Sequence, residues 1–135
     1  MCIRSRMGDE MSKLLIVVLA GVCLAVCTGT SAQGKTETVT GKVVDLVCWA
    51  RNKANTDLDH DAGRVCAIAC IKWEGNPAGI VTAEGKAYQL AGALVARNNA
   101  EISKHIAHTV TITGNVYEKD GMTMLSADTI TMVSK

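Results

Sequence analysis

Aromatic side chains are scarce in this chain: its 135 residues include two tryptophans, two tyrosines and no phenylalanine. Proteins that bind single-stranded nucleic acid usually stack the bases on aromatic side chains within a basic groove. The formal net charge is only +1, so there is no excess of positive charge to hold phosphates. Both shortages argue against nucleic acid as a partner, whatever the fold.

Sequence patterns of the common enzyme classes are also missing. The chain has no glycine-rich phosphate loop, no Cys-x-x-Cys-His haem site, no paired acids in an apolar frame and no serine, histidine and aspartate in a catalytic order. Internal repeats and low-complexity tracts are absent as well. The sequence therefore favours a binding or structural module over an enzyme.

The N-terminal region has the order of a secretory signal peptide. Lys13 precedes an unbroken apolar run of 14 residues, and small residues follow it up to Ala32. A membrane-spanning helix needs roughly 18 or more apolar residues, so no membrane span is expected in the mature form. Residues 1–32 are predicted to be removed, which makes residues 33–135 a single periplasmic or secreted domain.

Two details of this leader remain open. Met11 is a better start of translation than Met1, because the acidic residues at positions 9 and 10 put negative charge where an export signal carries positive charge. A lipoprotein with lipid on Cys27 is an alternative, but Val26 stands where such signals usually carry a small residue.

Removal of the leader changes the charge and the cysteine count. The leader contains three of the 14 basic and two of the 13 acidic residues, so 11 of each remain and the net charge becomes zero. Of the six cysteines, Cys48, Cys66 and Cys70 remain. An odd number in an oxidising compartment indicates a free thiol, an intermolecular bridge or thiolates bound to a metal.

The first half of the mature chain predicts a strand, a loop and a helix. Residues 39–48 are rich in β-branched side chains and predict a strand that is bent or bulged at Gly41. Residues 50–63 are polar and predict a loop. Residues 64–73 contain good helix formers and predict a helix, ended by the glycine and proline that follow.

The second half predicts two hairpins around another helix. Residues 80–90 alternate around a Glu-Gly turn, and residues 109–135 around an Asp-Gly turn, with Ile130 and Met132 in the last strand. Asn98, followed three residues later by glutamate, approximates a capping box and predicts the helix between them. Five strands with a helix between the third and fourth predict a mainly β, OB-like small barrel; an open α+β sheet is the alternative.

The candidate site lies on the insertion after the first strand. Cys66 and Cys70 are four residues apart on the predicted helix, so their side chains share one face, about 6 Å apart at Cβ. Cys48 is predicted at the end of the first strand, and His60 just before the helix. Thiolates and imidazole select Zn(II) or Cu(I). Cys48, His60, Cys66 and Cys70 are therefore predicted to form a metal site, with a spacing irregular for a zinc finger.

Other interpretations of the cysteines stay open at this point. A disulfide from Cys48 to either helical cysteine would staple the insertion to the barrel, as in many secreted domains. All three cysteines could instead be packing residues, or a helical thiol could be a redox nucleophile. These alternatives describe a structural or interaction domain and a thiol redox protein, in place of a metal store, carrier or sensor.

Two further polar groups are not expected to bind metal. The aspartates at positions 57, 59 and 61 match the start of a calcium loop, but alanine and isoleucine stand where such a loop needs glycine and glutamate. His105 and His108 are expected to be cations at the C-terminal end of the second predicted helix.

The motifs of the mature chain follow one pattern: Asp-x-x-Cys, a loop with a histidine, Cys-x-x-x-Cys, Gly-x-Pro-x-Gly and Gly-Lys-x-Tyr. They occupy residues 45–48, His60, residues 66–70, residues 75–79 and residues 85–88. In this pattern the chain resembles a group of small exported bacterial proteins with an OB-like domain. The resemblance implies a fold and a compartment, and it implies nothing about a reaction. A metal ion or another exported protein is the expected partner.

Overall fold

Six β-strands and several short helical segments make up the part of the chain that the computed structural model describes, residues 34–56 and 62–134. In chain order they are strand β1 (Lys35–Asp45), helix α2 (Leu46–Arg51), 3-10 helix η1 (Lys53–Thr56), helix α3 (Ala62–Trp73), strands β2 (Ala78–Val81) and β3 (Ala87–Ala91), 3-10 helix η2 (Gly92–Val95), helix α4 (Ala96–Asn99), 3-10 helix η3 (Ile102–His105), and strands β4 (Thr109–Lys119), β5 (Met122–Ser126) and β6 (Thr131–Ser134). The predicted signal peptide lies outside these residues.

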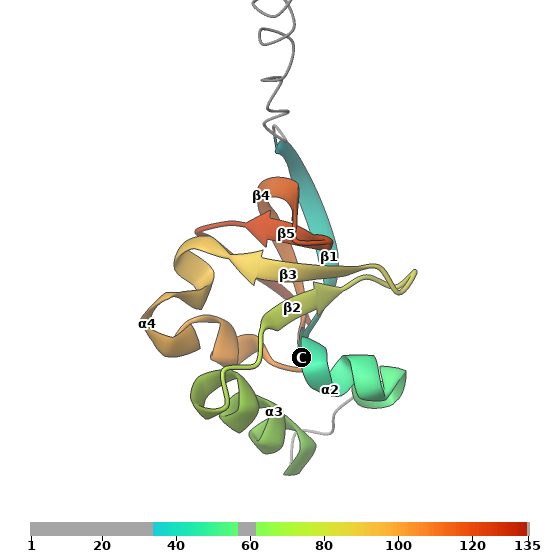
Figure 1. The fold of residues 1–135 in the computed structure, drawn as a ribbon, viewed down its shortest axis with the longest axis vertical. Helices are drawn as coiled ribbons and strands as arrows, with labels where there is room; N and C mark the ends of the chain where they lie inside the picture. Colours follow the sequence, from blue (N-terminus) through green and yellow to red (C-terminus); the bar gives the residue numbers. More distant parts are fainter. Residues whose placement is uncertain (1–33, 57–61, 135) are drawn as a thin grey trace, which may run out of the picture. The chain divides into compact units, whose positions relative to one another are not determined.

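Five of these strands close into a barrel in the order β1-β2-β3-β5-β4, because β4 pairs back onto β1 (Figure 1). Neighbouring strands are antiparallel except β3 and β5, which pair in parallel. Closure pairs the two edges that an open sheet would leave exposed. The predicted OB-like barrel is confirmed in place of the open α+β sheet, and β6 adds to β4 as a further strand.

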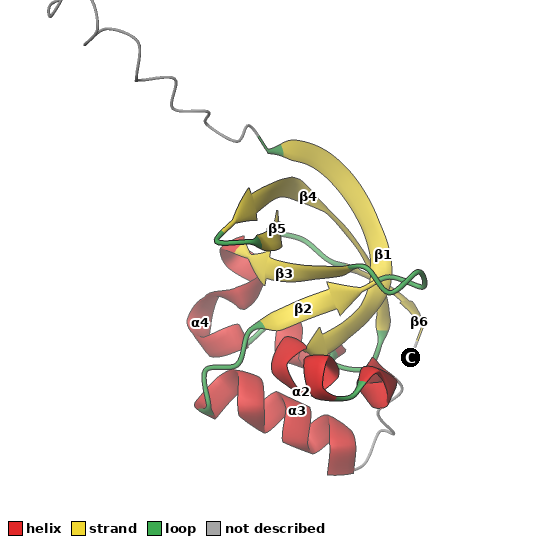
Figure 2. Ribbon diagram, turned by 45° about the vertical axis from the view of Figure 1, so that its right-hand side comes forward, coloured by secondary structure: helices red, strands yellow, loops and turns green. Residues whose placement is uncertain are grey.

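Aliphatic side chains from all five barrel strands fill the interior. The alternation of apolar and polar residues along each strand places one face inward. Buried residues of this core include Val43, Ile80, Leu90, Val110, Ile112 and Leu125. Helix α3 joins the same core through Ala67 and Ile71, which are 2% and 1% exposed. The helix is therefore anchored to the barrel by its apolar face, and Figure 2 shows it below the sheet with α2.

Gly41 lies where β1 changes its partner. β1 pairs with β4 as far as Lys42 and with β2 from Lys42 onward, and it curves around the barrel (Figure 2). A Cβ atom on Gly41 would lie 2.3 Å from the carbonyl oxygen of Val81, which only glycine avoids. The strand is curved at the predicted place, but the registers on both sides are continuous and no bulge forms.

Helix α3 confirms the helix predicted over residues 64–73. It ends with Gly75 in the left-handed region, at a φ of 75° that glycine adopts without steric penalty. The backbone N–H groups of Glu74 and Asn76 both donate to the carbonyl oxygen of Cys70. This ending turns the chain back toward β2 and places the Asn76 side chain beside the barrel.

The connection between β3 and β4 differs from the regular helix predicted there. Arg97, Asn98 and Asn99 have φ angles of 50°, 57° and 57°, and such left-handed residues interrupt an α-helix. The connection is therefore built from the short segments η2, α4 and η3, and Asn98 does not act as the predicted N-cap. Within the described ranges, no helix has both the length and the apolar character needed to cross a membrane.

The last strand also differs from the prediction. The hairpin partner of β4 is β5, which ends at Ser126 where its parallel pairing with β3 ends. The chain then returns to β4 as β6, so Met132 belongs to a separate strand and Ile130 lies outside both. The Asp-Gly turn between β4 and β5 is where the sequence predicts it.

Candidate metal centre

Asp45 ends β1 and begins helix α2. Its backbone is extended, and its Oδ1 atom accepts hydrogen bonds from the backbone N–H groups of Val47 (2.8 Å) and Cys48 (3.2 Å). An aspartate with these bonds is an N-cap, which satisfies donors that a helix leaves unpaired at its start. The prediction that Cys48 ends a strand before a polar loop is therefore wrong. The cap turns the chain into α2 first, so Cys48 lies in a helical turn, and η1 follows where loop was predicted.

The same carboxylate ties α2 to the end of α3. Its Oδ2 atom accepts a 2.8 Å hydrogen bond from the side-chain amide of Asn76, and the backbone N–H of Leu46 donates to the carbonyl oxygen of Pro77 over 3.0 Å. Asp45 is only 1% exposed. A buried carboxylate needs such donors, because removing its charge from water without them is costly. The bonds therefore hold a negative charge at a defined place between the two helices.

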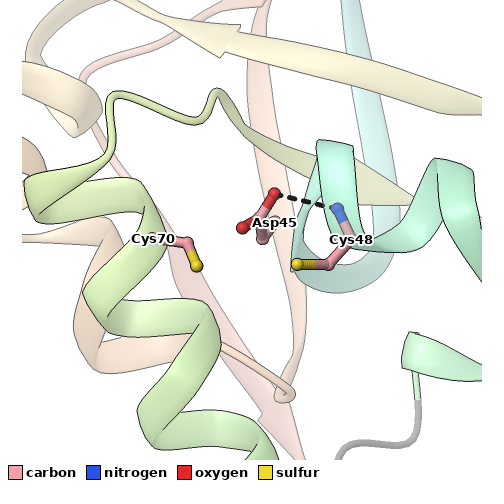
Figure 3. Close-up of side chains that lie close together, drawn as sticks. All are labelled: Asp45, Cys48 and Cys70. Atoms are coloured by element: carbon pink, nitrogen blue, oxygen red, sulfur yellow. Dashed lines mark hydrogen bonds between the residues drawn. The ribbon is translucent and has the colours of Figure 1, made fainter.

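Cys48 from α2 and Cys70 from α3 face each other across this carboxylate (Figure 3). The two Sγ atoms and one carboxylate oxygen of Asp45 all lie within 4.8 Å of one another. Both cysteines are half-buried. The position of Cys70 follows from the packing of α3. Ala67 and Ile71 face the barrel core, and the side of the helix that carries Cys70 faces α2.

The spacing of these atoms is close to that of a metal site. In a tetrahedral zinc centre the Zn–S bonds are about 2.3 Å long, which separates two sulfur ligands by roughly 3.8 Å. Ligand atoms already within 4.8 Å reach that separation through small side-chain rotations. Two thiols and a carboxylate are a donor set that suits a soft or borderline cation.

Burial and charge disfavour the thiolate forms when no cation is present. Burial, a hydrogen bond to Asp45 and the charge of Asp45 raise the pKa of Cys48 to about 11. Burial, followed by hydrogen bonding to Cys66 and nearby negative charge, also raises the pKa of Cys70. Nucleophilic cysteines need a lowered pKa and electropositive surroundings. Here the thiol pKa values are raised and the nearby charge is negative. A bound cation would offset that negative charge and favour the thiolates.

Cys66 lies one helical turn before Cys70 on α3, as the four-residue spacing predicts. It is exposed and contributes to the raised pKa of the Cys70 thiol, but it is not part of the group within 4.8 Å. His60 and the aspartates at 57, 59 and 61 lie outside the described residues. The structure thus brings Cys48 and Cys70 together, with Cys66 beside them, and His60 as a ligand stays a prediction.

Asp45 is the member of the group that the sequence reasoning did not include. The available signal is the Asp-x-x-Cys spacing at residues 45–48, which is also the spacing of an N-cap and the third residue of its helix. An N-cap side chain folds over the first turn, so it lies beside the residue three positions later. Once α2 is known to be helical, the Asp-x-x-Cys spacing therefore predicts that the Asp45 carboxylate lies beside Cys48.

His105 and His108 take no part in this group. The regular helix predicted to end at these histidines does not form: His105 ends the short 3-10 helix η3, and His108 lies beyond it. His105 lies in η3, where its Nε2 atom is 3.7 Å from a carboxylate oxygen of Glu101. His108 is buried just before β4.

The three described cysteines are free thiols in the structure. A disulfide bond is about 2.05 Å long, so the Sγ atoms of Cys48 and Cys70 are close neighbours that are not bonded. Comparisons with protein-family models, curated proteins and solved structures find no match to this chain. The chemistry of the site therefore has to be inferred from its own geometry.

Proposed function

We propose that this protein is an exported binding module that holds one Zn(II) or Cu(I) ion between helices α2 and α3, for storage, transfer or sensing. The observation that carries the proposal is the convergence of Cys48, Cys70 and Asp45 within 4.8 Å. Thiolates select these two ions over those that prefer oxygen ligands. The signal-peptide pattern of residues 1–32 supports the exported location.

The ligand set is completed by neighbours of the two central thiols. Both oxygens of Asp45 already accept hydrogen bonds, so its main contribution is negative charge close to the ion. Cys66, one helical turn before Cys70 on α3, supplies a third thiolate. His60 remains the sequence candidate for a fourth position. Three thiolates suit Cu(I), and an added imidazole suits tetrahedral Zn(II).

Metal titration of the reduced mature protein tests the proposal directly. Residues 33–135, purified without oxygen, should compete with a chromophoric chelator for one Zn(II) or Cu(I) ion per chain. The same protein with its three thiols alkylated is the control and should not compete. If the reduced protein removes neither Zn(II) nor Cu(I) from the chelator, the proposal is contradicted.

Metal affinity should fall as the pH falls. The pKa of Cys48 is raised to about 11 and that of Cys70 is also raised, so both thiols hold protons at pH 6 to 8 until a metal displaces them. Each displaced proton weakens the apparent affinity about tenfold per pH unit of acidification, or about a hundredfold for two thiols. Chelator competition between pH 6 and 8 measures this slope. A pH-independent affinity would show that the thiols are not the ligands.

A second candidate is the disulfide-stapled structural domain. The observation that favours it is the same short distance, because oxidation of Cys48 and Cys70 needs only a closer approach of two neighbouring sulfur atoms. A Cys48–Cys70 bridge would join α2 to α3 and leave Cys66 as the odd thiol. A mass deficit of two hydrogen atoms, mapped to this pair in freshly isolated and metal-free protein, would support the staple and exclude the metal site. The raised thiol pKa values give no support to the third alternative, a redox nucleophile.

A further inference from the structure

The three described cysteines differ in how far solvent reaches them. Cys66 is exposed on α3, whereas Cys48 on α2 and Cys70 on α3 are half-buried. Cys66 and Cys70 are one helical turn apart on the same side of α3, so their Cβ atoms are about 6 Å apart. The Sγ atoms of Cys70 and Cys48 lie within 4.8 Å of each other. Cys70 is therefore a neighbour of both other thiols, and Cys66 is the one that a molecule in solution reaches first.

Access and ionisation decide which thiol reacts with a disulfide from solution. In such an exchange a thiolate attacks one sulfur atom of the disulfide and displaces the other, so the attacking sulfur has to be accessible and ionised. Cys66 is accessible. Cys48 and Cys70 are half-buried, and burial together with nearby negative charge raises the pKa of both thiols. Direct attack by the central pair on a bulky disulfide is therefore expected to be slow.

We propose that Cys66 is an exchange thiol, through which a small-molecule disulfide such as oxidised glutathione joins Cys48 to Cys70 and so releases the bound ion. The release of the ion rests on the function proposed above, whereas the exchange route depends on the three thiols alone. Cys48 and Cys70 are ligands in the metal-bound state, so the ion and the bridge exclude each other. The thiols of the metal-loaded protein stay reduced until such an oxidant is in excess.

Three exchange steps produce the bridge. The Cys66 thiolate attacks one sulfur of oxidised glutathione, whose S–S bond breaks and releases one glutathione thiolate. The Cys70 thiolate then attacks the Cys66 sulfur and releases the second glutathione. Finally the Cys48 thiolate attacks the Cys70 sulfur, and Cys66 leaves with its electron pair. Two protein thiols are oxidised and one glutathione disulfide is reduced, while the protons of Cys48 and Cys70 pass to the two glutathione thiolates.

The geometry of α3 favours the last step. A bridge between Cys66 and Cys70 would join two positions that the backbone of one helix holds fixed, and a disulfide forced from its preferred geometry is more easily reduced. Cys48 and Cys70 come from different helices, with their sulfur atoms already close. The bridge within α3 is therefore an intermediate, and the bridge between α2 and α3 is the product.

The rate of bridge formation in Cys66→Ser tests this route. Reduced, metal-free protein is mixed with oxidised glutathione, quenched with acid at intervals, alkylated and mapped by mass spectrometry. The unchanged protein should end with a Cys48–Cys70 bridge and a free Cys66, and Cys66→Ser should form the same bridge about tenfold more slowly or worse. Val65→Ser, at the exposed position beside Cys66, is the matched control and should keep the original rate. Equal rates in Cys66→Ser and the unchanged protein would overturn the proposal.

The other two serine variants trap the intermediates. Cys70→Ser should stop with glutathione on Cys66, because the second attacking thiol is missing. Cys48→Ser should stop with a bridge between Cys66 and Cys70. Glutathione attached mainly to Cys48 in Cys70→Ser would show that the oxidant enters elsewhere, and the assignment of Cys66 would then be wrong.

Release of the ion is measured separately on Zn(II)-loaded protein. Oxidised glutathione should transfer Zn(II) to a chromophoric chelator as the bridge forms, faster than in a sample without oxidant, and dithiothreitol should restore binding. If Zn(II) stays bound after the bridge has formed, the regulation is wrong while the metal site stands. If the reduced protein takes up no ion at all, the proposed function fails, and the exchange rates of the metal-free protein still decide the role of Cys66.

Discussion

Replacing Cys70 by serine is expected to lower the affinity for Zn(II) or Cu(I) by on the order of a hundredfold or more, with the fold retained. Cys70 provides one of the two thiols at the centre of the group. A serine hydroxyl does not ionise near neutral pH, and it binds these ions poorly. The exchange of sulfur for oxygen barely changes the volume of a half-buried side chain. Competition with a chelator measures the loss, and circular dichroism confirms the fold.

Variants of the other candidate ligands should differ in how much metal affinity they lose. Cys48→Ser should cost as much affinity as Cys70→Ser. Cys66→Ser should cost less, because this thiol is exposed and has to turn toward the ion. His60→Ala should weaken binding while water takes the vacant position. His105→Gln is the control and should have no effect, since His105 lies outside the group and beside Glu101. An affinity in Cys70→Ser equal to that of the unchanged protein would exclude the proposed centre.

Replacing Asp45 by alanine is expected to destabilise the protein by about 2 to 3 kcal/mol. The loss combines the N-cap bonds to Val47 and Cys48 with the bond from Asn76. It leaves buried donors without acceptors, which is the costly way to remove a hydrogen bond. Urea unfolding of the metal-free protein measures the change. Asp128→Ala is a suitable control, because this exposed aspartate accepts one 3.4 Å bond from Ala93 and should cost less than about 1 kcal/mol.

Asp45→Asn separates the structural role of this residue from its charge. Asparagine can still cap α2 through its side-chain oxygen, and the Asn76 side-chain amide, which now donates to Asp45, can turn over so that its oxygen accepts a hydrogen bond from the new NH2 group. The free energy of unfolding should therefore change by less than about 1 kcal/mol. The negative charge is lost, and with it part of the cause that raises the pKa of Cys48. At a fixed pH, Cys48 should therefore carry more thiolate and react faster with iodoacetamide. Unchanged alkylation of Cys48 would show that Asp45 acts only as a cap.

Local patterns in the sequence predict the regular elements of this protein well. The Glu-Gly and Asp-Gly turns lie between the expected strands, and helix α3 forms and ends where its glycine and proline indicate. Cys66 and Cys70 share a side of that helix because a four-residue spacing is about one helical turn. Each of these features depends on residues close together in the chain, so periodicity and turn preferences suffice to find them.

Contacts between distant segments decided what the sequence left open. The parallel pairing of β3 with β5 joins the two halves of the barrel, and the pairing of β4 with β1 closes it. Pairing with β4 also makes residues 131–134 a separate strand. Asp45 caps α2 through bonds to nearby residues, but only the folded chain brings Asn76, across a separation of 31 residues, to its other oxygen. That cap puts Cys48 on a helix and turns its thiol toward Cys70. Such contacts form when the chain packs around a shared core, and no local period in the sequence records them.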